Sequence, residues 1–149
     1  MLRKARIEDI KEIYNLVNYF AQKGEMLPRS QSELYENMRD FFVVEDNGEV
    51  IGCCALHILW DDLAEVKSLA VKESHQGKGI GKMLVNACVE EAKALGIKRV
   101  FALTFKPGFF QKLGFRLIDK DDLPRKVWGE CIKCPLFPEC KEEAVIIEL

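Results

Sequence analysis

A glycine-rich segment that follows a short apolar stretch constrains this chain more than any other feature. Leu69, Ala70 and Val71 have the character of a strand end, and an amphipathic helix begins a few residues later. Glycine at every second position lets the backbone approach a ligand closely and can point successive amides in one direction. The N-terminus of the following helix adds partial positive charge. The segment therefore predicts a phosphate or pyrophosphate site at Gln76, Gly77, Lys78, Gly79, Ile80, Gly81 and Lys82.

Two common nucleotide-binding motifs do not fit this segment. A P-loop has Ser or Thr after its lysine to bind magnesium, whereas this chain has Met83 there. A dinucleotide fingerprint has a third glycine where Lys82 stands. For the loop taken alone, glycines that only allow a helix to pack against a strand remain an alternative.

The composition indicates one folded domain without a strongly charged partner. With 149 residues and 48% hydrophobic content the chain can bury one sizeable core, so we expect a single domain over residues 1–149. The net charge of −2 argues against nucleic acid or a membrane as a partner, and the apolar runs are too short to span a bilayer. No hydrophobic signal region follows Met1, so we expect a cytoplasmic protein whose cysteines are thiols or metal ligands rather than disulfides.

Hydrophobic periodicity and turn signals alternate between strands and helices along the chain. Strands are expected at residues 2–5, 41–45, 49–59, 64–71, 99–105, 115–118 and 144–149. Helices are expected from Ile7 to a stop at Gly24, after a Ser30 cap, and at residues 79–95 and 107–113. The buried stripe expected on the helix at 79–95 is Ile80, Met83, Leu84, Ala87, Cys88, Ala92 and Leu95. The pattern predicts an α/β domain with a mixed, mostly antiparallel sheet.

The loop resembles the acetyl-coenzyme A pyrophosphate site of the GNAT acetyltransferase superfamily. Gln76, Gly79 and Gly81 match its Gln/Arg-x-x-Gly-x-Gly/Ala pattern, and Leu-Ala-Val at 69–71 lies at the expected distance upstream. The resemblance implies the GNAT fold, in which two parallel central strands splay apart and helices flank the sheet. It also implies acetyl-CoA as cosubstrate, with its pantetheine along residues 69–71.

Glu65 is the candidate general base. Acetylation of an amine needs a neutral nucleophile, so a nearby group must accept a proton from the ammonium. In GNAT histone acetyltransferases a general-base glutamate precedes the valine of the Ala-Val pair by the same six residues. If no bulge intervenes, Glu65, Lys67, Leu69 and Val71 share one face of their strand. A solvated strand carboxylate paired with Lys67 is the alternative interpretation.

A second family motif is altered in this chain. Many GNAT enzymes return a proton to the departing thiolate from the tyrosine of Phe-Tyr-x-x-Leu-Gly-Phe, but here Phe110 follows Phe109 at that point. Water, Tyr14 or Tyr35 would then supply the proton, and both phenylalanines are expected to pack against the core and the coenzyme. His57 and His75 are expected as ordinary strand and turn residues, with a catalytic role as the alternative.

Three cysteines near the C-terminus, Cys131, Cys134 and Cys140, form a C-x2-C-x5-C run that resembles half of a metal site. With only three clustered ligands, a turn with free thiols, or with one disulfide formed on purification, is the preferred interpretation, and no metal is expected. Zinc or an iron–sulfur cluster is the alternative. We expect this segment to shape the substrate side of the pocket without acting as a nucleophile, because it has no neighbouring histidine.

The resemblance narrows further, to the short stand-alone N-acetylglutamate synthases of bacterial arginine biosynthesis. It rests on residues 26–30, 64–71 and 123–128 with the following cysteines. This implies acetylation of the α-amine of L-glutamate. The two carboxylates of glutamate need cationic partners, and the candidates are Arg29, Lys67 and Lys126, with the hydroxyl of Ser30. A homodimer is compatible with the sequence. The alternatives are a GNAT acting on another small amine or a protein N-terminus, and a CoA-binding sensor that has lost catalysis.

Overall fold

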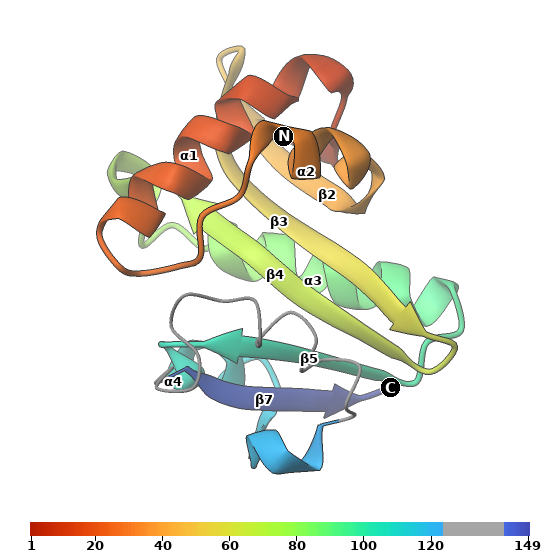
Figure 1. Ribbon diagram of the computed structural model, residues 1–149. Coiled ribbons are helices and arrows are strands. Elements are labelled where there is room, and N and C mark those ends of the chain that lie inside the picture. The colour runs from red at the N-terminus through yellow and green to blue at the C-terminus, as the bar shows by residue number, and fades with distance from the viewer. Residues whose placement is uncertain (124–141) are drawn as a thin grey trace.

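The computed structural model describes residues 1–123 and 142–149. Within these residues seven strands form one mixed sheet in the order β1-β2-β3-β4-β5-β7-β6, and four helices pack around it (Figure 1). The strands are β1 (Leu2–Lys4), β2 (Phe41–Asp46), β3 (Glu49–Trp60), β4 (Leu63–Val71), β5 (Arg99–Thr104), β6 (Arg116–Ile118) and β7 (Glu143–Glu148). All neighbouring strands are antiparallel except β4 and β5. This arrangement confirms the predicted mixed, mostly antiparallel sheet.

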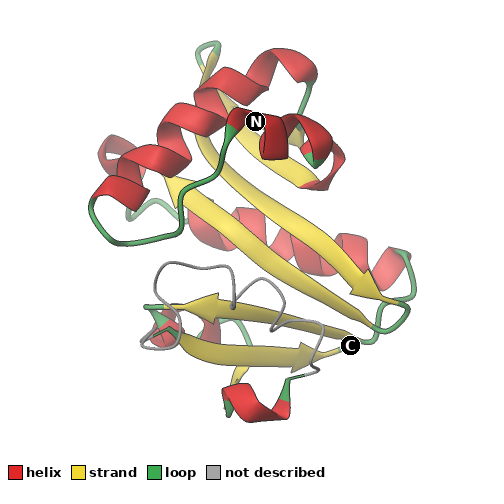
Figure 2. Ribbon diagram, in the orientation of Figure 1, coloured by secondary structure: helices red, strands yellow, loops and turns green. Residues whose placement is uncertain are grey.

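Helices cover both faces of the sheet (Figure 2). They are α1 (Ile10–Gln22), α2 (Gln31–Glu36), α3 (Ile80–Ala94) and α4 (Pro107–Gln111), with short 3-10 turns at Ile7–Asp9, Met38–Asp40, Glu73–His75 and Lys120–Asp122. Helices α1 and α2 bury their apolar sides against β2, β3 and the end of β4. Helix α3 and Phe110 of α4 pack on the opposite face. Two separate apolar layers therefore hold the central strands from both sides.

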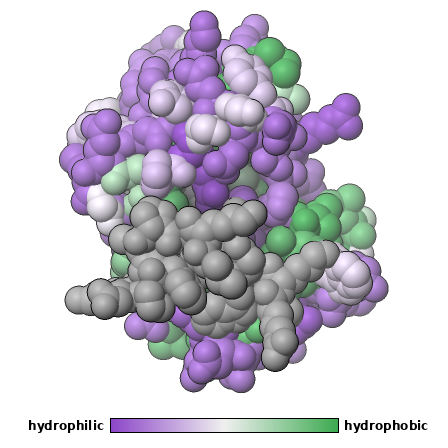
Figure 3. Space-filling model, viewed as in Figure 1, coloured by the Kyte–Doolittle hydropathy of each residue, from purple (hydrophilic) through white to green (hydrophobic). Residues whose placement is uncertain are grey.

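The sequence signals explain the N-terminal helices. Helix α1 buries Ile10, Ile13, Val17 and Phe20 along one side, and the surface over α1 and α2 is predominantly hydrophilic (Figure 3). Helix α2 begins at the expected cap, because the Ser30 hydroxyl accepts a hydrogen bond from the Glu33 N–H at 3.1 Å. None of the described helices is long and apolar enough to cross a membrane.

Strands β4 and β5 separate after a short parallel contact. Their register consists of Leu63 with Arg99, Ala64 with Val100 and Glu65 with Phe101. Beyond Glu65, strand β4 continues to Val71 and pairs only with β3 among the described residues. The backbone of β4 on that side is thus left for other hydrogen-bonding partners, as the expected splay requires.

A bulge in β4 changes which residues share a face. Ala70 pairs with Cys53 and Lys67 pairs with Ala55, so two residues of β4 stand opposite one residue of β3. Ser68, one of the two, has a left-handed backbone with a φ of +57°. The expected common face of Glu65, Lys67, Leu69 and Val71 is therefore wrong. Leu69 and Val71 pack toward the α3 layer, whereas Ala70 belongs to the α1 layer.

The buried side of α3 also differs from the expected stripe. Met83 and Leu95 are exposed, at 45% and 56% of their surface, while Val85 and Val89 are buried. Ile80, Leu84, Cys88 and Ala92 are buried as expected. The contact side of the helix is rotated because α3 packs diagonally across β2, β3 and β4 (Figure 1).

Candidate active site

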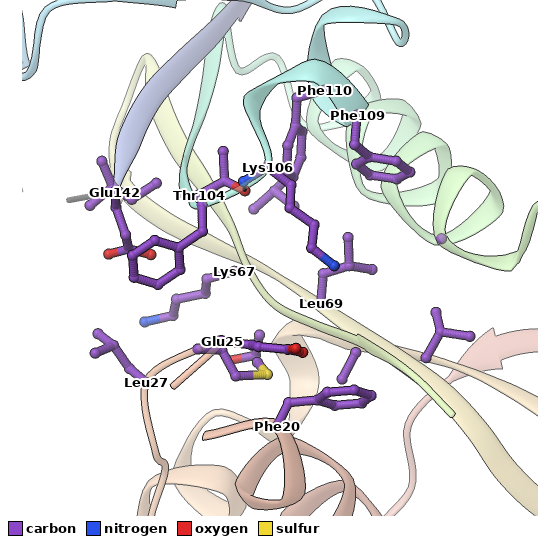
Figure 4. A pocket seen from close by; sticks show the side chains of 18 of the residues that line it. Phe20, Glu25, Leu27, Lys67, Leu69, Thr104, Lys106, Phe109, Phe110 and Glu142 are labelled. Carbon is purple, nitrogen blue, oxygen red and sulfur yellow. Dashed lines mark hydrogen bonds between the residues drawn. The ribbon is translucent and has the colours of Figure 1, made fainter. Parts of the chain in front are cut away.

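The separation of β4 and β5 opens into a pocket of about 890 Å³. Phe20 and Leu27 approach from the α1 side, and Thr104, Lys106, Phe109, Phe110 and Glu142 from the β5–β7 side (Figure 4). Residues of β4 form the floor between them, and the glycine-rich loop closes one end. The predicted residues that line this pocket are Arg29, Glu65, Lys67, Leu69, Ala70, Val71, Gln76, Gly77, Gly79, Ile80, Gly81, Lys82, Phe109 and Phe110.

The glycine-rich loop contains two left-handed glycines and leads directly into α3. Gly77 and Gly79 have φ values of +78° and +81°, and a Cβ built on either would meet no atom within 4 Å. Both therefore face open space at the loop surface. Gly79 directly precedes α3, whose first amides have no partner within the helix. Gln76 fixes the loop to the end of β4, since its Nε2 donates to the Val71 carbonyl at 3.0 Å.

Gly81 has a packing role. A Cβ at this position would lie 3.3 Å from Cζ of Phe109, closer than most real contacts. Phe109 and Phe110 pack edge to face with ring centroids 5.2 Å apart, and Phe110 packs in the same way on Phe115. Gly81 therefore lets α4 approach the start of α3, and Phe110 fills core space beside the pocket.

Glu65 is a carboxylate held inside the protein. It is 6% exposed, lines the pocket and lies at the last rung of the β4–β5 contact. Its cross-strand partner on β3 is His57. Lys67, two residues further along the same face, projects between the two sides of the pocket (Figure 4). A buried carboxylate next to an open pocket is suited to accept a proton from a bound ammonium.

The remaining predicted residues are distributed as follows. Arg29 lines the pocket and forms an ion pair with Glu33 at 3.4 Å. The Ser30 hydroxyl is used as the cap of α2, and Lys78 is exposed; neither is among the described lining residues. Tyr14 and Tyr35 are likewise not among them. Lys126 and the three C-terminal cysteines lie outside the described residues.

The lining also contains polar residues that were not predicted as site residues, among them Glu25, Thr104, Lys106 and Glu142. The Thr104 hydroxyl accepts a hydrogen bond from the Lys106 N–H at 2.9 Å, so its own proton is available to an acceptor in the pocket. One signal could have found Thr104 and Lys106, because ligands of parallel strands bind at the strands' carboxyl ends. Glu25 and Glu142 had no comparable signal.

The described cysteines are buried and unreactive in character. Cys53 and Cys54 point to opposite faces, as expected, and Cys88 packs from α3. Burial raises the pKa of the Cys53 thiol to about 12. The neighbouring Cys88 thiol, together with burial, raises the pKa of Cys54 well above its usual value. Among the described residues no group of His, Cys, Asp and Glu side chains is arranged to hold a metal.

We expect iodoacetamide at pH 8 to leave Cys53, Cys54 and Cys88 unmodified in the native enzyme. Thiolates are the reactive form, and raised pKa values keep Cys53 and Cys54 protonated until well above this pH. Peptide mass spectrometry after timed labelling gives the modified fraction, with urea-unfolded protein as the control that labels fully. Rapid native labelling of Cys53 would contradict the buried placement.

Comparison with known proteins identifies the family. The sequence model of the acetyltransferase (GNAT) family matches residues 7–115. The chain belongs to the GNAT acetyltransferase family. This GNAT enzyme is accordingly an N-acetyltransferase that uses acetyl-CoA as cosubstrate.

Relatives and solved structures extend the likeness over the whole GNAT chain. An uncharacterised N-acetyltransferase of Chlorobaculum tepidum is 40% identical over 97% of this chain and 94% of its own length. An amino-acid acetyltransferase of Mycobacterium tuberculosis is 38% identical over 87% of this chain and 76% of its own length. A Mycobacterium tuberculosis protein crystallised in complex with CoA superposes with a TM-score of 0.88 at 32% identity, covering 100% and 99% of the two chains. N-acetylglutamate synthase from Neisseria gonorrhoeae, complexed with CoA and N-acetyl-glutamate, superposes with a TM-score of 0.88 at 27% identity. The match covers 100% of this chain and 35% of that longer chain.

Proposed function

We propose that this enzyme transfers the acetyl group of acetyl-CoA to the α-amine of L-glutamate. The observation that carries the proposal is the buried carboxylate of Glu65 in the same pocket as the cationic side chains of Arg29 and Lys67. The names of its relatives, amino-acid acetyltransferase and N-acetylglutamate synthase, support the same substrate class.

The cosubstrate is proposed to bind along the floor and closed end of the pocket. The amides around Gly77 and Gly79, with the N-terminus of α3, suit the pyrophosphate. Lys82 and Lys106 line the same region and add positive charge. The backbone of residues 69–71, which has no β5 partner among the described residues, suits the amides of the pantetheine arm.

Acetyl transfer then proceeds by direct attack. Glu65 accepts a proton from the substrate ammonium, and the nitrogen lone pair forms a bond to the thioester carbonyl carbon. Collapse of the tetrahedral adduct breaks the carbon–sulfur bond, and the departing thiolate of CoA takes up the second proton that the nitrogen loses, directly or through water. Thr104 is proposed to donate a hydrogen bond to this thiolate, because its hydroxyl proton is available in the pocket and Phe110 has none to give. Binding both reactants together supplies much of the rate advantage.

Two acidic residues favour a second candidate substrate. Glu25 and Glu142 line the pocket together with Glu65, so the lining carries negative as well as positive charge. Carboxylates near the acceptor would suit a basic small amine or a diamine better than glutamate. The two candidates therefore differ in the charge expected on the substrate side chain.

Release of free CoA thiol across a substrate panel separates these candidates. The panel comprises glutamate, glutamine, aspartate, lysine and a polyamine, each at equal concentration with saturating acetyl-CoA. Preference for glutamate supports the proposal, and preference for lysine or a polyamine supports the second candidate. Binding of CoA without turnover of any amine would favour a sensor.

Replacing Arg29 with alanine is expected to raise KM for glutamate by roughly ten- to a hundredfold. Loss of a hydrogen bond to a charged group corresponds to about 1.5–3 kcal/mol. The KM for acetyl-CoA should change much less, which steady-state kinetics with each substrate varied in turn will measure. Arg116→Ala is the matched control, because Arg116 forms an exposed ion pair with Glu148 on β7. Equal effects on both KM values would contradict a role for Arg29 in glutamate recognition.

A further inference from the structure

His57 and Asp40 form a hydrogen-bonded pair behind the candidate base. His57 Nδ1 lies 2.7 Å from Asp40 Oδ2. Because a carboxylate only accepts hydrogen bonds, Nδ1 carries the proton and Nε2 is the nitrogen left to exchange one. The pair is partly exposed, with 31% of the His57 side chain and 25% of the Asp40 side chain accessible.

The strand register places this pair next to Glu65. His57 on β3 is directly opposite Glu65 on β4, and the rungs on either side, Leu56 with Val66 and Ile58 with Ala64, are regular. Directly opposed side chains share one face of a sheet and have Cβ atoms about 5 Å apart. His57 is not among the described residues that line the pocket. It lies on β3, on the side of β4 away from β5.

A base inside the protein must lose its proton before each new cycle. Glu65 is almost completely buried, so direct release of its proton to bulk water is restricted. An imidazole can both accept and release a proton near neutral pH. The Asp40 carboxylate accepts the hydrogen bond of Nδ1 and so holds the ring in one orientation.

We propose that His57, supported by Asp40, carries the proton of Glu65 to solvent. Glu65 gives its proton to Nε2 of His57 and returns to the carboxylate. The imidazolium then releases a proton to water or a buffer base and returns to the neutral ring. His57 touches no reactant, so it is a positioning residue that acts through Glu65, and the inference rests on the proposed role of Glu65. The charged groups facing it are Asp40, Glu65 and, two rungs away on the same face, Lys67.

The test is chemical rescue in the full-length enzyme. His57→Ala, measured at pH 7 in a dilute buffer that accepts protons poorly, is expected to lower kcat roughly tenfold or more. The KM for acetyl-CoA should stay within about twofold. Added imidazole should restore most of the lost kcat, because it replaces the missing ring, and should have no effect on the parent enzyme. A parental kcat for His57→Ala, or a loss that imidazole does not restore, would overturn the relay.

Two further variants separate a relay from a structural role. His57→Gln keeps a hydrogen-bond donor for Asp40 but cannot carry a proton, so it should be folded, as slow as His57→Ala, and unresponsive to imidazole. If His57→Gln is as active as the parent enzyme, the relay is wrong and His57 serves only to hold Asp40 by a hydrogen bond. Glu65→Gln should be slow with or without imidazole. If Glu65→Gln is as active as the parent, the proposed base fails; if it is slow while the His57 variants are normal, only the relay fails.

Discussion

Replacing Glu65 with glutamine is expected to lower kcat by roughly 10²–10⁴-fold, the range typical of a lost general base. The amide preserves the size and shape of a side chain that is 6% exposed but cannot accept the proton of an ammonium. The affinity for acetyl-CoA should change far less, because the proposed contacts of the cosubstrate are with the loop and the backbone of residues 69–71. Stopped assays of thiol release, with CoA binding measured by calorimetry, give both quantities.

The pH–rate profile provides a second measurement on the same variant. The parent should show an acidic limb in which activity rises as a carboxylic acid loses its proton, and Glu65→Gln should lack this limb. Glu148→Gln is the matched control, since Glu148 is an exposed strand carboxylate paired with Arg116. If Glu65→Gln stays within a few-fold of the parent, Glu65 is a structural carboxylate.

Gly79→Val is expected to weaken acetyl-CoA binding by roughly a hundredfold or more, which corresponds to about 2.7 kcal/mol or above. The φ of +81° at Gly79 disfavours any Cβ, and the added side chain would fill the open space in front of the α3 amides. Helix α3 itself should persist, because its buried side lies further along the helix. Calorimetry or fluorescence titration with CoA measures the affinity.

Gly96→Val is the control that separates the loss of stability caused by a side chain at a left-handed position from the loss of CoA affinity. Gly96 lies just beyond the other end of α3 with a φ of +84°, has no atom within 4 Å of a built Cβ, and is not among the described pocket residues. Both variants should lower the melting temperature by similar amounts, but only Gly79→Val should lose CoA affinity. Equal affinity in the two variants would rule out the loop as the pyrophosphate site.

The parts of the site that depend on local sequence could be predicted, and the parts that depend on packing could not. The glycine-rich loop could be recognised because its conformation depends on consecutive residues, from 76 to 82. The bulge had no such signal: Ser68 adopts a left-handed backbone without being glycine, and only the pairing with β3 reveals it. The error reversed the predicted direction of Leu69 and Val71.

Long-range contacts account for the other differences. Helical periodicity fits Met83 and Leu95 as well as it fits Val85 and Val89. Only the way α3 crosses the sheet determines that the two valines are the buried residues. Glu25 and Glu142 reach the pocket from segments more than a hundred residues apart. The pairing of His57 with Asp40 and with Glu65 likewise depends on strand register, which residue periodicity alone does not fix.

The bulge at Ser68 divides β4 into two parts whose odd-numbered side chains point to different faces of the sheet. Before it, Glu65 and Lys67 line the pocket; after it, Leu69 and Val71 turn their side chains toward the α3 layer, and the backbone of the strand has no β5 partner among the described residues. On the proposed binding mode, substitution of Lys67 can therefore alter acceptor choice while Glu65 remains the base and residues 69–71 continue to serve acetyl-CoA. One strand can thus take on new acceptors in evolution or in the laboratory without rebuilding its cosubstrate half.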